Sequence, residues 1–354
     1  MLVIAISSQS RVNLATVKQR LDSAGIGYDA EFEHLTRFLK VDVSSIDDLP
    51  DNVRENVASA ADEDQEIGFD AWEKFEEGSR FSEQRITFDE EIDQDDNWGL
   101  GRIDKRNNPY TNAQNIDSTY RFNRTGKGVN VYVIDTGIDI NHQDFKERLT
   151  EDIGQEPELL YGGTDDNGHG THVASTIAGR KFGVAKGAKV FGVKVLDRDG
   201  RGSLISILRG VDKILRAHDG SEQPAVVNMS LGGQVRSENN PINHAVSQMI
   251  ENGLTVVAAA GNASTDLDED SIFHPAEIEK ALTVGAMDIN DRIAQFSNFG
   301  SAVDVFAPGV QIKGAWLNGG VAILSGTSMA APHVCGVVAQ MLEGKPKTEN
   351  FGDV

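Results

Sequence analysis

Three short glycine-containing segments carry the residues whose types suggest chemistry. They are Val133-Ile134-Asp135-Thr136-Gly137, Asn167-Gly168-His169-Gly170-Thr171-His172 and Gly326-Thr327-Ser328-Met329-Ala330. A serine hydroxyl attacks a carbonyl well only when a base takes its proton, and histidine titrates near neutral pH. A buried carboxylate then fixes the imidazole tautomer and stabilises the imidazolium. We therefore interpret Asp135, His169 and Ser328 as carboxylate, general base and nucleophile. Their chain order, Asp, His, Ser, is one of three known for such triads.

The segments around these three residues resemble those of the subtilisin-like serine proteases. From about Gly183 onward the sequence resembles the proteinase K branch most closely, and the resemblance covers roughly residues 98–343. It implies a serine endopeptidase that hydrolyses peptide bonds through an acyl-enzyme intermediate. Ala259-Ala260-Gly261-Asn262 resembles the family's oxyanion segment, which makes the Asn262 side chain one donor to the developing oxyanion. The backbone N–H of Ser328 is expected to be the second donor.

The resemblance also indicates how a substrate binds. Gly200-Arg201-Gly202 and Ser230-Leu231-Gly232 resemble the two backbone segments that pair with a polypeptide substrate as an extended strand. Residues 230–232 and 259–261 are expected to wall the primary specificity pocket. These residues are mostly small, which predicts an open slot for apolar or mixed side chains. Pro275 matches a position that is often a cis-proline in the family.

Calcium is the metal that the resemblance suggests, as a structural ion, and no cofactor is expected for catalysis. Asp304 matches a calcium ligand of proteinase K-like enzymes, with the carbonyls of Glu279 and Ala281 as companions. Oxygen-only ligation suits Ca²⁺, although Asp304 capping a turn is the alternative. His169 and His172 lie three residues apart, but the sequence has neither a His-Glu-x-x-His pattern nor a cysteine cluster. We interpret His172 as a packed helix residue.

Each residue taken alone has a simpler interpretation, and two other functions stay open. Asp135 and Asn262 could be turn residues, and Ser328 could be a helix N-cap. A catalytically silent binding or scaffold protein on the same fold is one alternative. An esterase on an α/β-hydrolase fold is the other. It predicts a Gly-x-Ser-x-Gly elbow and the order Ser, Asp, His, and the sequence shows neither at Ser328.

Composition agrees with an ordinary enzyme and disfavours some partners. The chain has 354 residues and a formal net charge of −22, and residues 1–96 carry 24 acidic against 9 basic side chains. No basic patch is available for phosphates, which disfavours nucleic-acid binding. No apolar run approaches the ~18 residues that a membrane helix needs, and the single cysteine, Cys335, permits no internal disulfide. The start lacks a basic n-region, so a cytoplasmic or virus-associated protein is favoured, with a secreted protein as the alternative.

Two domains are predicted, residues 1–96 and 97–354. In the first, Leu2–Ile6 is predicted as a strand, and Leu14, Val17 and Leu21 keep helical spacing. Residues 31–43 and 85–88 are further strand candidates, residues 62–80 are interpreted as an acidic helical insertion, and residues 89–96 as an acidic tether. This small α+β domain resembles the family's propeptide, which acts as an intramolecular chaperone and inhibitor. An unrelated accessory domain is the alternative.

The second domain predicts an α/β fold. Apolar runs that suit strands covered on both faces occur at residues 129–134, 190–195, 225–229, 254–260, 281–286 and 304–306. Amphipathic helices lie between them, as in Leu204, Ile207, Leu208, Val211 and Leu215. The pattern predicts a three-layer subtilisin-like fold with a mostly parallel central sheet. The catalytic segments fall at strand ends, where such sheets place their sites.

Overall fold

The computed structural model describes residues 1–6, 12–29, 32, 34–35, 37–62, 66–68, 97–111, 118–146, 158–234, 240–268 and 273–351. The first part of the chain forms a four-stranded antiparallel sheet with the order β2-β3-β1-β4. Its strands are β1 (Leu2–Ile6), β2 (Tyr28–Asp29), β3 (Phe38–Val41) and β4 (Val57–Asp62). Helices α1 (Leu14–Ala24) and α2 (Asp51–Arg54) and a 3-10 turn (Ile46–Asp48) complete it.

The alternation of side chains along β1 explains how this sheet packs. Leu2, Ile4 and Ile6 join the cluster that includes Val17 and Leu21 of α1. Val3 and Ala5 face the other way, into a cluster with helices of the second part of the chain. Because successive strand residues point to opposite faces, one strand serves two cores. The predicted strand at residues 2–6 and the predicted helix are both confirmed.

The second part is built on a seven-stranded sheet in which every pairing is parallel, with the order β15-β14-β12-β10-β6-β8-β7. Its strands are β6 (Asn130–Asp135), β7 (Glu158–Tyr161), β8 (Lys189–Lys194), β10 (Ala225–Met229), β12 (Thr255–Ala259), β14 (Leu282–Met287) and β15 (Val305–Pro308). All six predicted strands are present, within about two residues at either end. The parallel α/β architecture is confirmed, and β7 is the sheet strand that the sequence did not predict.

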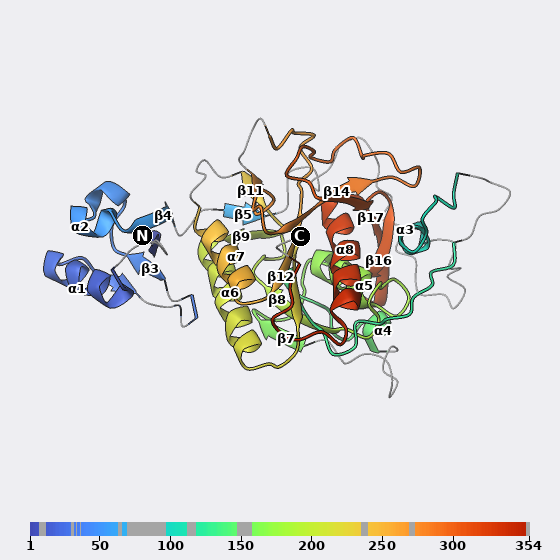
Figure 1. Ribbon diagram of the computed structural model, residues 1–354, viewed down its shortest axis with the longest axis horizontal. Coiled ribbons are helices and arrows are strands. Elements are labelled where there is room, and N and C mark those ends of the chain that lie inside the picture. Colours follow the sequence, from blue (N-terminus) through green and yellow to red (C-terminus); the bar gives the residue numbers. More distant parts are fainter. Residues whose placement is uncertain are drawn as a thin grey trace.

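Helices cover both faces of this sheet (Figure 1). Helices α6 (Leu204–Asp219) and α7 (Pro241–Glu251) pack on Tyr132 and Ile134 of β6, whereas α5 (His169–Ala178) and α8 (Thr327–Leu342) pack on the opposite face, with Val131 and Val133. This is the three-layer arrangement expected when strands are apolar on both faces. The remaining elements are α3 (Trp98–Ile103), α4 (Gln143–Lys146), the hairpin β16 (Ile312–Trp316) and β17 (Gly320–Leu324) with a 3-10 turn (Leu317–Gly319), and the pair β11 (Gly233–Gln234) and β13 (Phe273–His274).

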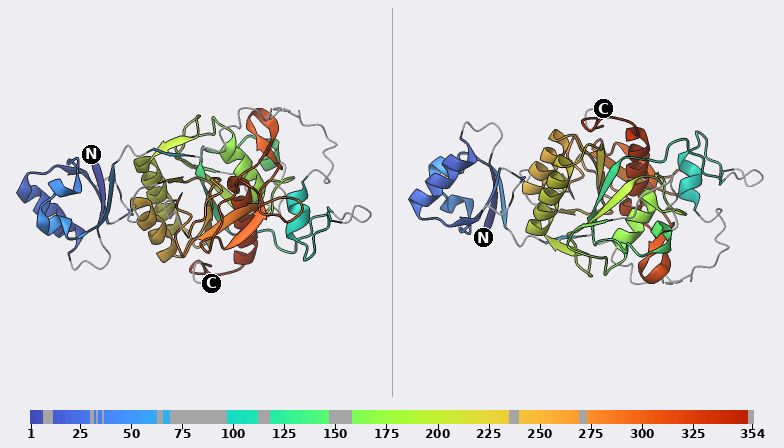
Figure 2. Two further views of the ribbon diagram at one scale, coloured as in Figure 1. Left: turned by 90° about the horizontal axis from the view of Figure 1, so that it is seen from above. Right: turned by 90° about the horizontal axis from the view of Figure 1, so that it is seen from below.

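The N-terminal sheet sits against α6 and α7, as both views of Figure 2 show. Val3, Ala5, Leu35 and Phe38 share an apolar cluster with residues of these two helices. The backbone N–H of Leu35 donates to the carboxylate of Asp212, a buried residue of α6, at 2.9 Å. Burial of an unpaired carboxylate is costly, so this contact ties the two parts together at a defined place.

One further strand links the two parts and corrects a prediction. Strand β5 (Glu66–Gly68) pairs antiparallel with β9 (Arg201–Ser203), and Ile67 lies opposite Gly202. Figure 1 shows β5 between β9 and β11. The acidic helical insertion predicted for residues 62–80 is therefore wrong where the structure describes it, because Asp62 ends β4 and residues 66–68 are extended. The rest of that insertion, the strand candidate at 85–88 and the tether at 89–96 lie outside the described residues.

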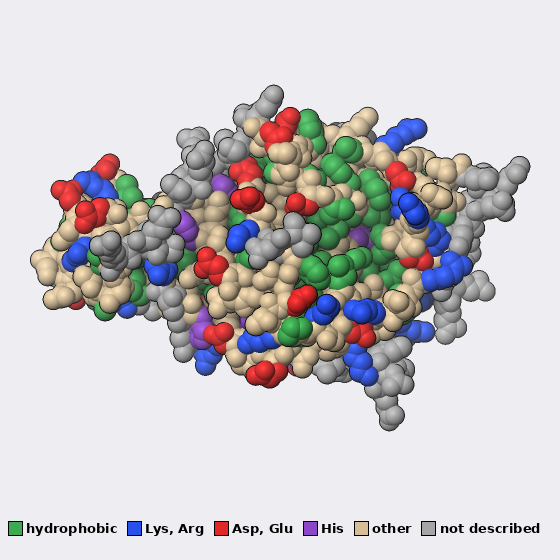
Figure 3. Space-filling view, viewed as in Figure 1, with side chains coloured by type: hydrophobic (Ala, Val, Ile, Leu, Met, Phe, Trp, Pro, Cys, Tyr) green, Lys and Arg blue, Asp and Glu red, His purple; other side chains and the backbone are tan. Residues whose placement is uncertain are grey.

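The surface is mixed in character. Figure 3 shows hydrophobic side chains gathered over α8 and the neighbouring strands, with acidic and basic side chains interspersed around them. Exposed large apolar residues include Val305, Ile323 and Met341. Among the described residues, no helix combines the length and apolar character required to cross a bilayer.

Candidate active site

Asp135 is the last residue of β6, an inner strand of the parallel sheet, so its side chain emerges at the carboxyl edge of the sheet. The residue is fully buried, and the N–H of Thr136 donates to its Oδ1 at 2.7 Å. Burial raises the pKa of the Asp135 carboxyl, an effect opposed by His169 and by the Thr136 hydrogen bond. The Asp135 carboxylate is therefore held in place by hydrogen bonds from Thr136 and His169.

His169 is the first residue of α5 and lies against Asp135. Its Nδ1 is 2.8 Å from Oδ1 and 2.9 Å from Oδ2 of the carboxylate, and both side chains are buried. Because a carboxylate only accepts, Nδ1 carries the proton and Nε2 is the basic nitrogen. Gly170 makes this approach sterically feasible, since a Cβ there would lie 2.1 Å from the Gly137 carbonyl oxygen.

Ser328 is the second residue of α8, and only 4% of it is exposed. Its Oγ donates to the carbonyl of Ser230 at 3.2 Å, and the Oγ of Ser230 donates back to the Ser328 carbonyl at 2.9 Å. These reciprocal bonds fix the start of α8 against the end of β10. The Ser328 N–H lies in the first turn of α8, where N–H groups lack an intrahelical acceptor.

Asn262 follows β12 and is 3% exposed. Its Oδ1 accepts from the N–H of Thr327 at 2.8 Å and from the Thr327 hydroxyl at 2.9 Å. With the amide oxygen occupied on this side, the Nδ2 group is the part of the side chain that can donate to a ligand. Asn262 is thus oriented as a hydrogen-bond donor beside the residue that precedes Ser328.

A pocket brings Ser328 and Asn262 together with most of the predicted pocket wall. It is lined by Leu231, Gly232, Gly233, Ala259, Ala260, Gly261, Asn262, Phe273, His274, Ala276, Thr327 and Ser328. Most of the predicted pocket wall is on this surface, whereas the Ser230 side chain is buried behind it. The bond between His274 and Pro275 is cis, as predicted.

The other predicted substrate segment, residues 200–202, does not line this pocket. Gly200 has a φ of +73° and belongs to the turn before β9, while Arg201 and Gly202 are in β9. The β9 segment is paired with β5, so in this structure a strand of the same chain takes the place that was predicted for a substrate.

Of the residues predicted to hold calcium, Asp304 contacts Thr283, which follows Ala281 by two residues. Asp304 donates its N–H to the Thr283 carbonyl at 3.0 Å, and its Oδ2 accepts from the Thr283 N–H at 2.7 Å. Asp304 is thus bonded to Thr283, and Glu279 and Ala281 precede Thr283 by four and two residues in the chain. Asp304 and Glu279 are exposed. Over the ranges that the structure describes, no three His, Cys, Asp or Glu side chains gather as a metal cluster.

His172 is a packed residue of α5, as predicted. It is fully buried, and its Nε2 lies 3.1 Å from the Ile312 carbonyl oxygen. Sequence reasoning did not identify the role of Asp165, whose buried carboxylate contacts both the Asp135 loop and the start of α5. No local sequence pattern marks Asp165, because its partner Thr136 lies 29 residues earlier in the chain.

Comparisons with known proteins agree with this arrangement. The model of the Subtilase family (Peptidase_S8) matches residues 126–351. An extracellular serine proteinase of Thermus sp. (strain Rt41A) is 44% identical over 252 residues, which cover 70% of this chain and 57% of that protein. Proteinase T of Parengyodontium album is 42% identical over 261 residues, covering 72% of this chain and 83% of that protein.

A solved structure is also similar. The crystal structure of a cold adapted subtilisin-like serine proteinase is 41% identical, with a TM-score of 0.62, and the match covers 71% of this chain and 86% of that one. The matched part spans 57% and 55% of the length of the first two curated relatives. The family model, the relatives and the solved structure agree with the parallel α/β fold and with the buried pair of His169 and Asp135, and the chain belongs to the Subtilase family.

Proposed function

We propose that the chain is a serine endopeptidase that cleaves polypeptides through an acyl-enzyme. The observation that supports it most is the buried pair of His169 and Asp135, with Nδ1 held at 2.8 Å from the carboxylate. A buried carboxylate on one imidazole nitrogen leaves the other as a base of fixed direction. The similarity to proteins named as proteinases supports the same reaction.

In this proposal the hydroxyl of Ser328 turns from the Ser230 carbonyl to Nε2 of His169. Oγ attacks the peptide carbonyl carbon while Nε2 takes its proton, and Asp135 stabilises the imidazolium. The oxyanion accepts hydrogen bonds from Nδ2 of Asn262 and the N–H of Ser328. The tetrahedral intermediate collapses as the imidazolium gives its proton to the leaving amine. Water then cleaves the acyl-enzyme by the same proton transfers in reverse order.

The substrate is proposed to bind as an extended strand between residues 200–202 and 230–232. Main-chain hydrogen bonds of this kind supply affinity, and the pocket supplies selectivity. The walls contributed by Ala259, Ala260 and Gly261 are small, which favours apolar or mixed side chains. A library of peptide substrates that differ at the residue before the scissile bond tests this preference.

A fluorophosphonate that labels activated serines tests the reaction itself. Intact mass should increase by one adduct in the wild-type chain and not in Ser328→Ala, while Ser325→Ala, a control in the preceding loop, should still be labelled. A panel of peptides and esters then separates a peptidase from an esterase. A folded wild-type chain that takes no label and cleaves no peptide would favour the silent scaffold.

We further propose that residues 1–96 act as an intramolecular inhibitor of residues 97–354. The support is that β5 pairs with β9, the segment that a substrate would use, and that Leu35 and Asp212 join the two parts. Ile67→Pro should weaken the strand and raise the initial rate on a small peptide substrate, because proline disrupts a β-ladder. Ile67→Ala keeps the N–H and should leave the rate near that of the wild type. Release of an N-terminal fragment of roughly 95 residues, detected by mass spectrometry, would show that the chain also cleaves itself.

A structural calcium ion at Asp304 is proposed on chemistry alone. One carboxylate and the carbonyls of Glu279 and Ala281 form an oxygen donor set of the kind that Ca²⁺ takes. Added Ca²⁺ should raise the melting temperature of the wild-type chain, and Asp304→Asn should remove most of that increase. An equal increase in both proteins would place the ion elsewhere.

A further inference from the structure

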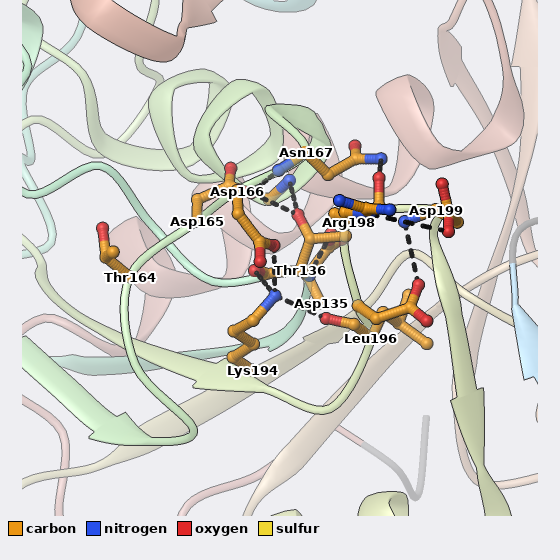
Figure 4. A network of polar contacts seen from close by, with 12 residues as sticks. Asp135, Thr136, Thr164, Asp165, Asp166, Asn167, Lys194, Leu196, Arg198 and Asp199 are labelled. Atoms are coloured by element: carbon orange, nitrogen blue, oxygen red, sulfur yellow. Dashed lines mark hydrogen bonds and ion pairs between the residues drawn. The ribbon is translucent and has the colours of Figure 1, made fainter.

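Asp165 belongs to a network of polar contacts that includes Asp135, Thr136 and Asn167 (Figure 4). Its side chain is 6% exposed and lies between the loop after Asp135 and the first turn of α5. Oδ1 accepts from the Thr136 hydroxyl at 2.8 Å and from the N–H groups of Asn167 and Gly168, both at 2.9 Å. Oδ2 accepts from Thr171 twice, from N–H at 2.9 Å and from the hydroxyl at 2.6 Å. The carboxylate thus receives five hydrogen bonds.

These bonds connect the two segments that carry Asp135 and His169. Thr136 directly follows Asp135, and Gly168 directly precedes His169. A second set of bonds closes the network, because the Thr136 hydroxyl accepts from the Gly170 N–H at 2.9 Å. The Thr171 hydroxyl accepts from the N–H of Asp139, also at 2.9 Å. A shift of the Asp135 loop relative to α5 would therefore stretch bonds on both oxygens of Asp165.

The charge of Asp165 is balanced differently from that of its neighbour. Asp166 is half-exposed and forms an ion pair with Lys194 at 2.6 Å. Asp165 is buried, and the bonds it accepts come from backbone N–H groups and hydroxyls. Hydrogen bonds to an ionised carboxylate are stronger than those between neutral groups. Asp165 also adds a second negative charge near Asp135, which contributes to raising the pKa of the Asp135 carboxyl.

We propose that Asp165 is a positioning residue for the reaction, which holds the Asp135 loop and the His169 turn in register and whose charge favours the imidazolium. This inference rests on the proposed peptidase function. Two effects follow. Loss of the carboxylate loosens the contact between Nδ1 and Asp135, and a misplacement of about 1 Å in such a site can cost ~10²-fold in rate. Loss of the negative charge also makes the positive imidazolium less favourable.

Asp165→Asn and Asp166→Asn form a matched pair of neighbouring, nearly isosteric changes in the full chain. Asp165→Asn should lower kcat by about 10- to 100-fold with KM within about twofold, because substrate contacts are untouched. In the plot of kcat/KM against pH for Asp165→Asn, the rise on the acid side should occur at a lower pH than in the wild type. Asp166→Asn should keep kcat within about twofold and the pH profile unchanged, since that carboxylate faces Lys194 and solvent.

A purely structural role for Asp165 would lower the melting temperature without changing kcat or the pH profile of the folded fraction, and that result would overturn the inference. Thr171→Val keeps the charge of Asp165 and the Thr171 N–H, and it removes one bond to Oδ2 together with the acceptor of the Asp139 N–H. It should lower kcat less than Asp165→Asn and leave the rise on the acid side in place. If Asp165→Asn does not fold, a folded Thr171→Val with wild-type kcat would also overturn the inference. A wild-type chain that cleaves no peptide refutes the proposed function instead.

Discussion

Because two histidines are buried, we expect the folded chain to lose stability steeply in mild acid. His172 in α5 and His333 in α8 are both fully enclosed. Burial lowers the pKa of His172 to about 3, helped by the nearby His169, and burial lowers the pKa of His333 to about 4. Each ring has one nitrogen on a backbone carbonyl, at 3.1 Å from Ile312 and 2.9 Å from Met329. Both histidines therefore stay neutral in the folded state near neutral pH.

The sign and size of the effect follow from proton binding. An unfolded histidine titrates at a pKa of about 6.5, so below that pH the unfolded state binds protons that the folded state does not. The free energy of unfolding therefore falls as pH drops from about 6.5 towards 4, where the folded state begins to take up protons. At pH 5 the linkage relation gives a loss of roughly 2 kcal/mol for each histidine, and roughly 4 kcal/mol together. Whole domains are stable by only about 5–15 kcal/mol.

Urea unfolding followed by tryptophan fluorescence measures this loss at pH 7.5 and pH 5.0. The background should be Ser328→Ala, which prevents self-digestion. His333→Gln and His172→Gln should each reduce the difference between the two pH values by roughly 2 kcal/mol, whatever they cost at pH 7.5. Comparing differences also cancels the change in repulsion among the many acidic side chains.

Cys335→Ala is the control. Burial raises the pKa of the Cys335 thiol, which stays neutral over this range, so its loss should cost the same stability at both pH values. The reasoning would be refuted if both histidine variants lost as much stability between pH 7.5 and 5.0 as the parent does.

Three other perturbations have defined outcomes. Asn262→Ala should lower kcat by ~10²–10³ with little change in KM, a size taken from subtilisin rather than from this structure; a loss under about tenfold in steady-state assays would argue against its role as oxyanion donor. Gly170→Ala should abolish activity and lower the melting temperature, because the new Cβ meets the Gly137 carbonyl at 2.1 Å; wild-type activity would mean that α5 shifts freely. Lys186→Met should reduce the free energy of unfolding, measured in urea at pH 7.5, by about 2–4 kcal/mol. The reason is that the Lys186 ammonium donates to the carbonyls of Arg180 and Gly183 at 2.7 and 2.8 Å. An unchanged midpoint would show that water replaces the ammonium.

The sequence predicted the sheet well because its strands are apolar on both faces. The strand at residues 225–229 was bounded correctly, since its mainly apolar residues lie between Pro224 and the polar Ser230. Strand β5 could not be predicted in the same way. Glu66-Ile67-Gly68 has no strand pattern of its own, and its extended form comes from pairing with β9. Tertiary context decides the structure of such short segments.

The site divides in the same manner. The segments around Asp135, His169 and Ser328 could be compared with those of a known family because each of these three residues lies within its own local sequence pattern. Asp165 has no such pattern, because its function depends on a hydroxyl 29 residues earlier in the chain, that of Thr136. The distance between these two residues is a property of the folded sheet and helix, and sequence spacing does not contain it.

Because β5 and β9 belong to one chain, β5 has a high effective concentration at the edge of β9 with which it pairs. A strand joined to its own binding edge acts as if present at about millimolar concentration, however dilute the protein is. With a free peptide of similar intrinsic affinity at micromolar concentration, the ratio of bound to free edge would therefore be about a thousandfold lower. Cutting the connecting chain once would let the N-terminal part dilute to the concentration of the protein itself. A single hydrolysed bond would then change the occupancy of the β9 edge without altering any contact between the two strands.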